Sequence, residues 1–311
     1  MRTRRQFVVA AMLLGAMPAF AHTADTATMS LGWSWDPGIV IPLIVSALLY
    51  AFGTARIWRR SGHFDTRSVA AFAAGWTSLV VALNSPLHTL GEQLFWVHMT
   101  QHEVLVLVSA PLLVLAKPLV PMLWALPQRW RERLGRLGKS RAVTWTWSLI
   151  SAPLAAWVLH AIALWVWHAP VLFDLTLHSD FVHSMQHISF FGTGLLFWWA
   201  LIQGHKAKLG YGSSVAYVFT TAAHTSALGA LLTFAPTPWY TPYIPTAASW
   251  HLTALQDQQL GGLIMWVPSG TLLTVIGLAL LAAWLRQSER RWSYTRTAVL
   301  LNQGTGGGHE A

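Results

Sequence analysis

Long apolar stretches recur along this chain of 311 residues and restrict what it can fold into. Hydrophobic residues make up 54% of the chain and charged residues 10%, whereas a soluble domain carries about 25% charged residues. Each stretch is long enough to cross a hydrocarbon core of about 30 Å as a helix. The composition therefore predicts an all-α polytopic membrane protein.

Seven membrane spans are predicted, which together form a seven-transmembrane helix bundle. Their approximate limits are residues 38–58, 68–84, 96–116, 145–167, 183–203, 213–234 and 261–285. The predicted domains are a signal peptide at 1–21, an outer N-terminal segment at 22–37, a membrane domain at 38–285 and a cytoplasmic tail at 286–311. The Gly-rich end of that tail is expected to be disordered.

The first residues have the features of a secretory signal peptide. Arg2, Arg4 and Arg5 form a basic region, an apolar stretch follows at 7–20, and Ala-Phe-Ala at 19–21 is a small-x-small cleavage site. Cleavage after this site would leave the mature N-terminus on the outer side of the membrane. An uncleaved membrane anchor is the alternative.

The basic residues lie in alternate connections between the predicted spans. Outside the signal segment they are Arg56, Arg59, Arg60, Arg67, Lys117, Arg129, Arg131, Arg133, Arg136, Lys139, Arg141, Lys206, Lys208, Arg286, Arg290, Arg291 and Arg296. Lys and Arg favour the cytoplasmic side, so we expect a bacterial plasma (inner) membrane protein with its N-terminus periplasmic and its C-terminus cytoplasmic. The net charge of +9 then faces anionic membrane lipid, and nucleic-acid binding is not predicted.

The predicted outer side carries carboxylates and imidazoles but no Lys or Arg, a combination that attracts metal cations. The chain contains no cysteine, which excludes disulfides and thiolate metal sites. Any metal must therefore be held by His, Met, Asp or Glu.

Two stretches repeat the pattern His-x-x-Gln-His where a predicted span begins on the outer side. The first contains His98 and His102, and the second contains His183 and His187. Residues four apart lie on one helix face with β-carbons about 5–6 Å apart, so each pair can direct both imidazoles at one ion. Ionisable groups inside a span usually face the bundle interior and mark a function. These four residues are the predicted metal ligands, and hydrogen-bonded packing histidines are the alternative.

Further residues at similar depth could complete this site or orient its ligands. They are Glu103, Asp257, Met99, Met185, Met265 and His224. A carboxylate can orient an imidazole through a hydrogen bond, as can Gln101 and Gln186, and thioether sulfur favours Cu(I). Copper is therefore the predicted metal, with zinc also possible by ligand type. His88 and His168 are expected at the membrane interface.

Three hairpins share one layout. Pro86 and Pro170 each follow an outgoing span, and the next span then begins on His-x-x-Gln-His. The third hairpin follows this layout loosely, with Asp257, Gln258 and Gln259 in place of histidines just before the last span. This layout places comparable polar groups at one depth in the membrane.

These motifs together resemble the multi-spanning CtaG family of cytochrome c oxidase assembly factors. Ala-Pro-Leu-Leu at 110–113 follows the first His-x-x-Gln-His, Phe-Phe-Gly-Thr-Gly at 190–194 follows the second, and Gly-Gly-Leu-Ile-Met-Trp at 261–266 follows Asp-Gln-Gln. The resemblance covers roughly residues 35–285. It implies a non-enzymatic role in maturing a haem–copper oxidase by delivering copper, with an oxidase subunit or a copper chaperone as partner.

Two other functions are compatible with the same histidines. A copper transporter would need a polar path to the cytoplasmic side, of which Thr220, Thr221 and His224 offer a fragment. A membrane cytochrome would use histidines of two helices as axial haem ligands. The sequence contains no nucleotide-binding loop and no convincing Ser-His-Asp or Cys-His arrangement, so an enzyme is not predicted.

Overall fold

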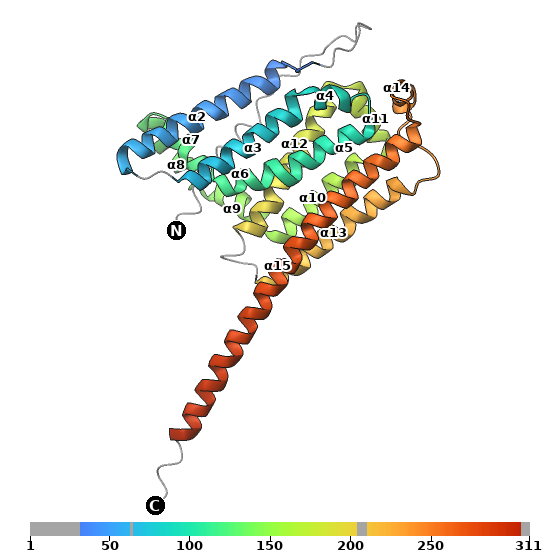
Figure 1. Cartoon of the computed structure of the whole chain (residues 1–311). Coiled ribbons are helices and arrows are strands. Elements are labelled where there is room, and N and C mark those ends of the chain that lie inside the picture. Colours follow the sequence, from blue (N-terminus) through green and yellow to red (C-terminus); the bar gives the residue numbers. More distant parts are fainter. Residues whose placement is uncertain (1–31, 63–64, 204–209, 306–311) are drawn as a thin grey trace, which may run out of the picture.

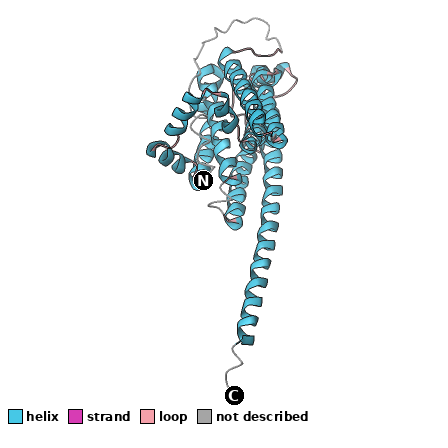
Figure 2. Cartoon of the chain, turned by 90° about the vertical axis from the view of Figure 1, so that its left-hand side faces the viewer, coloured by secondary structure: helices cyan, strands magenta, loops and turns pink. Residues whose placement is uncertain are grey.

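The fold is a bundle of helices. The computed structural model describes residues 32–62, 65–203 and 210–305, and every regular element in these ranges is helical (Figures 1 and 2). The predicted all-α fold is therefore confirmed. The predicted signal peptide at 1–21 and most of the segment at 22–37 lie outside the described residues.

Six helical segments among the described residues are long and apolar enough to cross a membrane. They are α2 (Pro37–Ser61), α3 (Thr66–Asn84), the continuous run Phe95–Ala116, α12 (Asp180–Ile202), α13 (Tyr211–Thr233) and the part Ala254–Glu289 of α15 (Ala254–Thr305). The chain is thus a membrane protein.

The predicted span at 145–167 is broken into two helices. It consists of α9 (Arg141–Ile150) and α10 (Pro153–Trp167), which meet at a bend of 66°. Proline disfavours helical geometry in the residue before it, so Pro153 can start a helix but cannot continue one through Ala152. The predicted number of seven spans holds only if this bent pair crosses the membrane as one span.

The third predicted span contains a π-helical turn. It runs through α5 (Phe95–Glu103), the π-helix η2 (Val104–Ser109) and α6 (Ala110–Ala116). A π-turn contains more residues than an α-turn, and such turns are frequent at functional sites. Pro111 follows directly, and a proline ring clashes with the carbonyl four residues earlier in a regular helix. That carbonyl belongs to Leu107, which lies within the π-helical turn, so the wider turn falls where the clash would otherwise arise.

The three hairpins contain short helices at one end of the bundle, which we name the histidine end. They are α4 (Pro86–Gly91), α11 (Pro170–His178) and α14 (Tyr243–Ser249) (Figure 1). Pro86 and Pro170 each occupy the first position of their helix, where the missing N–H has no helical partner to lose. The connections of these hairpins are therefore partly helical.

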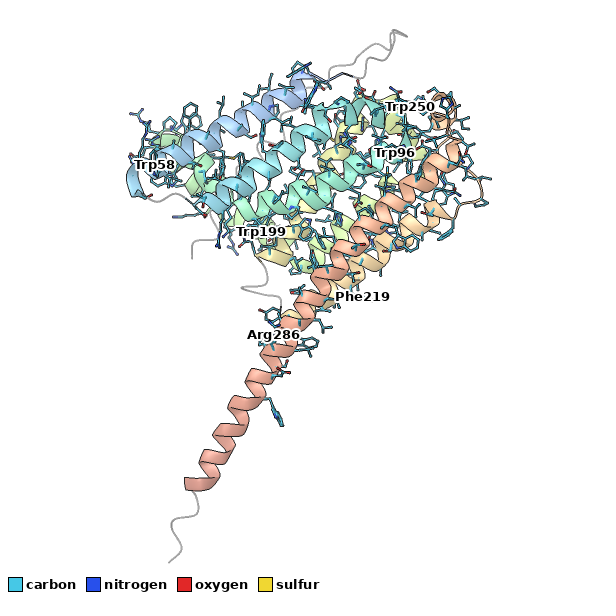
Figure 3. The ribbon with its side chains drawn as sticks, viewed as in Figure 1. Trp58, Trp96, Trp199, Phe219, Trp250 and Arg286 are labelled. Carbon is cyan, nitrogen blue, oxygen red and sulfur yellow. The ribbon has the colours of Figure 1, made fainter. Side chains whose placement is uncertain are left out.

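The opposite end carries the arginines and is named the basic end. Here α7 (Leu119–Ala125) packs on α2, and the amphipathic α8 (Gln128–Leu137) follows. Arg56 at the end of α2 donates to the carbonyls of Trp124 and Leu126 at 3.5 and 3.4 Å. Trp58 lies at this end, Trp96 and Trp250 lie at the histidine end, and α15 continues past the bundle beyond Arg286 (Figure 3). Tryptophans at both ends match the aromatic belts of membrane proteins.

Close helix packing brings the elements of the histidine end together. Helix α15 packs along α13 and also against α5, while α12 packs against η2 and α6. A Cβ at Gly262 would lie 2.7 Å from the carbonyl oxygen of Gly229, so α13 and α15 approach at a distance that only glycine permits. Because α12 packs against η2 and α6, the third and fifth predicted spans are neighbours.

Replacing Gly53 with alanine is expected to destabilise the contact of α2 with α7. A Cβ at Gly53 would overlap the backbone carbonyl of Pro121, and forced overpacking costs about 1–3 kcal/mol. Thermal unfolding of the purified protein in detergent would measure the loss. Gly192→Ala in α12 is the matched control, because its Cβ would meet nothing within 4 Å. Equal unfolding temperatures for the two variants would contradict the prediction.

Candidate metal centre

The four histidines of the two His-x-x-Gln-His motifs converge on one cluster at the histidine end. His98 and His102 project from α5, and His183 and His187 project from α12. The ring centroids of His98 and His183 lie 5.2 Å apart, and those of His102 and His187 lie 5.3 Å apart. The two pairs thus face each other across the helix interface, as a shared site requires.

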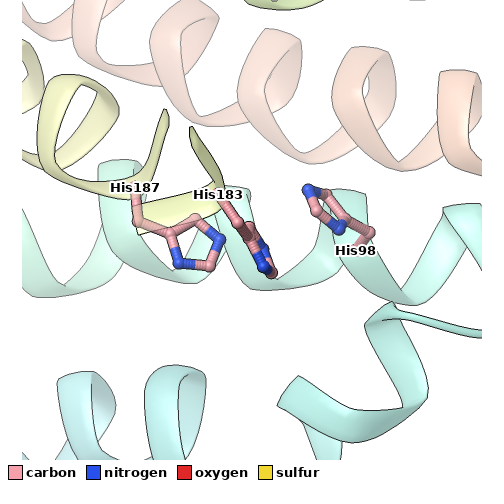
Figure 4. Close-up of side chains that lie close together, drawn as sticks. All are labelled: His98, His183 and His187. Carbon is pink, nitrogen blue, oxygen red and sulfur yellow. The ribbon is translucent and has the colours of Figure 1, made fainter. Parts of the chain in front are cut away.

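Three of these imidazoles are arranged around a common point. His98, His183 and His187 each offer a ring nitrogen, and the three nitrogens lie within 4.8 Å of one another (Figure 4). Three nitrogens bound at 2.0–2.1 Å to one metal ion lie roughly 3.5 Å apart. Small side-chain rotations would therefore close the set, which we name the three-histidine centre.

The cluster contains buried nitrogens without hydrogen-bond partners among the described residues. They are Nδ1 of His98, both ring nitrogens of His102, Nε2 of His183 and Nε2 of His187. Buried polar groups are normally hydrogen-bonded, and an orphaned one costs about 1–3 kcal/mol. Several orphaned lone pairs at one point are therefore suited to a cation, and this donor set fits copper or zinc.

The glutamine of each motif contacts a histidine of another helix. Nε2 of His98 donates to Oε1 of Gln186 at 3.2 Å, which leaves the lone pair of a neutral ring on the orphaned Nδ1. Nε2 of Gln101 lies 3.1 Å from Nδ1 of His88 and donates to the carbonyl of Ala82 at 2.7 Å. The glutamines therefore fix ring orientation, as the motif indicated.

Asp257 holds α5 in place. Among the described residues its carboxylate bonds to backbone N–H groups and to no imidazole, so the orienting role expected of it is not seen there. Its carboxylate accepts from the backbone N–H groups of Phe95 and Trp96 at 2.8 and 3.0 Å. These are the first residues of α5, whose preceding residue provides no side-chain cap. A carboxylate at a helix N-terminus satisfies free donors and complements the helix dipole. Asp257 thus sets the position of His98 from the first turn of α15.

Asp257→Ala is expected to lower the free energy of unfolding by about 1–3 kcal/mol, because two buried N–H groups lose their acceptor. It should also weaken metal binding, since α5 then loses its anchor one turn before His98. Thermal unfolding and a metal titration of the purified variant would measure both effects. Asp257→Asn, which retains one acceptor oxygen, should lie between the wild type and Asp257→Ala; an Asp257→Ala variant with wild-type values would refute the anchoring role.

A second group of predicted residues lines an internal cavity of about 40 Å³ beside the cluster. The cavity lies between α5, α10, α12, α13 and α15, and its walls include Met99, Glu103 and Met265 together with His102. Oε2 of Glu103 is buried and has no hydrogen-bond partner among the described residues. Glu103 thus faces the cavity, and its Oε2 makes no hydrogen bond to an imidazole among the described residues.

Two other predicted residues lie elsewhere. Met185 is partly exposed, and it does not line the cavity. His224 packs edge-on against the Trp157 ring at 5.3 Å between ring centroids, and it also lies off the cavity wall. Neither residue is brought to the cluster.

His168 belongs to the cluster, although the sequence placed it at the membrane interface. Its side chain is only 3% exposed, and its ring centroid lies 6.5 Å from that of His102. The hydroxyl of Tyr240 donates to its backbone carbonyl at 2.9 Å and ties it to the connection before α14. The only signal for the position of His168 in the sequence was Pro170, two residues later. The chain turns at Pro170, and this turn directs the end of α10 toward the bundle interior.

His88 of α4, the other histidine expected at the membrane interface, lies beside the cluster. Its ring centroid lies 5.5 Å from that of His183, and its side chain is 14% exposed. Burial lowers the pKa of His88, although the charges of Asp36 and Asp180 act in the opposite direction. Nδ1 of His88 accepts from Nε2 of Gln101, so the lone pair of the neutral ring is already used and His88 borders the centre without a free lone pair for a metal ion.

Aromatic rings and apolar side chains border the centre. Phe173 of α11 lies 5.2 Å from His98 between ring centroids and packs on Tyr240 at 4.3 Å. On the side of α2, His187 borders an apolar groove of about 250 Å³ between α2, α3, α6, α7 and α12. The centre is therefore largely shielded from water, which strengthens its electrostatic interactions with an ion.

The family of the chain is decided by comparison of its sequence with known families. A sequence model described as cytochrome c oxidase caa3 assembly factor (Caa3_CtaG) matches residues 48–287, a range that contains the whole histidine cluster. The chain belongs to this family. The resemblance seen in the three motifs is thereby confirmed, and the Caa3_CtaG description indicates a role in cytochrome c oxidase assembly.

This Caa3_CtaG chain is also similar to mycobacterial proteins described as uncharacterised. Those of Mycobacterium bovis and Mycobacterium tuberculosis are each 30% identical to it over 268 residues, and that of Mycobacterium leprae is 26% identical over 266 residues. Each alignment covers 83% of this chain but 40% of the relative, so the chain spans less than half the length of these curated relatives. No solved structure matches it significantly.

Proposed function

We propose that this chain binds copper at the three-histidine centre and passes it to a cytochrome c oxidase during assembly. One observation carries the proposal: three buried imidazoles from two helices converge within 4.8 Å, and each has a ring nitrogen without a hydrogen-bond partner among the described residues. The role is non-catalytic, because copper is bound and released unchanged.

Copper fits this donor set better than the other candidate metals. Imidazole binds both copper and zinc, but thioether sulfur prefers Cu(I). Met99 is fully buried beside the cluster, and Met265 lines the same cavity. An oxidase assembly factor also has a chemical need for copper, since haem–copper oxidases contain it.

The orientation follows from the charge distribution. The arginines of α2 and α8 lie at the basic end, which the preference of Lys and Arg assigns to the cytoplasm. The three-histidine centre then lies on the periplasmic side of a bacterial plasma membrane. Copper would bind there and reach the oxidase without crossing the membrane.

A copper titration of the purified full-length protein tests the proposal. Under anaerobic conditions, with a chromogenic Cu(I) chelator as competitor, we expect the triple variant His98→Ala, His183→Ala, His187→Ala to bind one copper fewer per chain than the wild type. His178→Ala is the matched control, because this histidine is exposed on α11. Equal copper binding by the wild type and the triple variant would overturn the proposal, and a Soret band in the purified wild type would favour a haem protein instead.

A further inference from the structure

The side chains of His168 and Met99 face each other through two atoms that can accept a hydrogen bond but cannot donate one. Nδ1 of His168 lies 2.7 Å from the backbone carbonyl of Leu164, and a carbonyl oxygen cannot donate, so the ring proton is on Nδ1. In the neutral ring, Nε2 then carries a lone pair. Nε2 lies 3.4 Å from Sδ of Met99, which likewise carries only lone pairs. His168 is 3% exposed and Met99 is 0% exposed.

This contact has the dimensions of two ligands around one ion. Metal–nitrogen and metal–sulfur bonds of about 2.0 and 2.3 Å span 3.4 Å when the angle between them is roughly 105°. That angle is close to the tetrahedral value of about 109°, so two further ligands would complete a tetrahedral shell. The adjoining cavity of about 40 Å³ has room for an ion, since a single water needs about 10–15 Å³ of such space.

His102 lies between this pair and the three-histidine centre. Its ring centroid is 4.4 Å from that of His98, 5.3 Å from that of His187 and 6.5 Å from that of His168. Both of its nitrogens are buried without a hydrogen-bond partner among the described residues, and it lines the cavity. No hydrogen bond in this region therefore holds the ring in one position.

We infer that His168 and Met99 form a second, sulfur-containing Cu(I) site, with His102 as a ligand that can serve either site. The inference rests on the proposed function for the arrival of copper at the three-histidine centre. Imidazoles alone bind zinc as well as copper, whereas a thioether ligand selects Cu(I). Two sites in series would thus pass Cu(I) from the three-histidine centre to the second site, whereas zinc would stay at the three-histidine centre.

Metal loading of the detergent-purified full chain tests this inference. We expect the wild type to bind two Cu(I) ions, with X-ray absorption showing a sulfur scatterer at about 2.3 Å. Met99→Leu should bind one Cu(I), lose the sulfur signal and still bind one zinc ion at the three-histidine centre. The double variant His183→Ala, His187→Ala should retain one Cu(I) with sulfur. Met122→Leu, a buried methionine near the basic end, is the matched control and should behave as wild type.

The possible outcomes separate the two proposals. One Cu(I) with nitrogen ligands only, unchanged in Met99→Leu, would overturn the second site and leave the proposed function standing. No Cu(I) in the wild type would overturn both. If Met99→Leu fails to fold, as loss of zinc binding would reveal, the wild-type sulfur signal decides: its presence supports the second site and its absence refutes it.

Discussion

Replacing both His183 and His187 with leucine is expected to stabilise the metal-free protein. Each of these residues has a buried Nε2 without a partner among the described residues, and an orphaned buried group costs about 1–3 kcal/mol. Leucine fills a similar volume without a polar atom, so the cost disappears. The free energy of unfolding of the metal-free double variant should therefore rise by about 2–6 kcal/mol, less any loss from imperfect packing.

The same variant should lose stabilisation by copper. A ligand present at a hundred times its dissociation constant adds about 2.7 kcal/mol to the free energy of unfolding of the wild type. Thermal unfolding in detergent, with and without Cu(I), would measure both effects, and His178→Leu, at an exposed position of α11, should change neither. A metal-free double variant that is less stable than the wild type would show that these histidines serve packing, and the metal-site interpretation would lose its main physical support.

Replacing His98 with alanine in the producing cell is expected to lower cytochrome c oxidase activity at least tenfold when copper is scarce. His98 is fully buried and contributes one of the three converging nitrogens, so its loss leaves an incomplete ligand set. The oxidase should then accumulate with less copper. Oxidase activity of isolated membranes and the copper content of the purified oxidase are the two measurements.

The level of the variant protein must be followed in the same membranes. Immunoblotting would show whether His98→Ala accumulates normally, and His178→Ala, an exposed histidine of the same end, should give wild-type oxidase activity. Normal copper content of the oxidase in cells whose His98→Ala protein no longer binds copper would separate assembly from copper delivery and contradict the proposed function.

The local geometry of the cluster could be predicted from the sequence. A spacing of four places His98 and His102 on one face of a helix whatever surrounds it. The distribution of Lys and Arg indicated that both His-x-x-Gln-His motifs lie on one side of the membrane. Their position in the hairpins indicated that they lie at the same depth. The sequence could not predict that α5 and α12 are neighbours, because their proximity depends on how α12 packs against η2 and α6.

His168 and Asp257 show why the remaining features required the structure. The depth of His168 depends on how the chain turns between α10 and α11, and sequence periodicity does not report such turns. Asp257 acts on an N–H group 162 residues earlier in the chain, at Phe95. Its acidic side chain in an apolar span indicated a function, but not which helix it would cap.

The π-helical turn at Val104–Ser109 sets the direction in which His98 and His102 point, because it determines how α5 is rotated relative to α6. Each residue of an α-helix turns the chain by about 100°. A wider π-turn rotates the chain by less per residue, so if these six residues became α-helical with none removed, everything before them would rotate by roughly the turn of one α-helical residue relative to α6, which packs on α12 and α3. His98 and His102 would then point away from α12 with every ligand still present in the sequence. The candidate metal centre therefore depends on the π-helical conformation of a segment without metal ligands as well as on the histidines themselves.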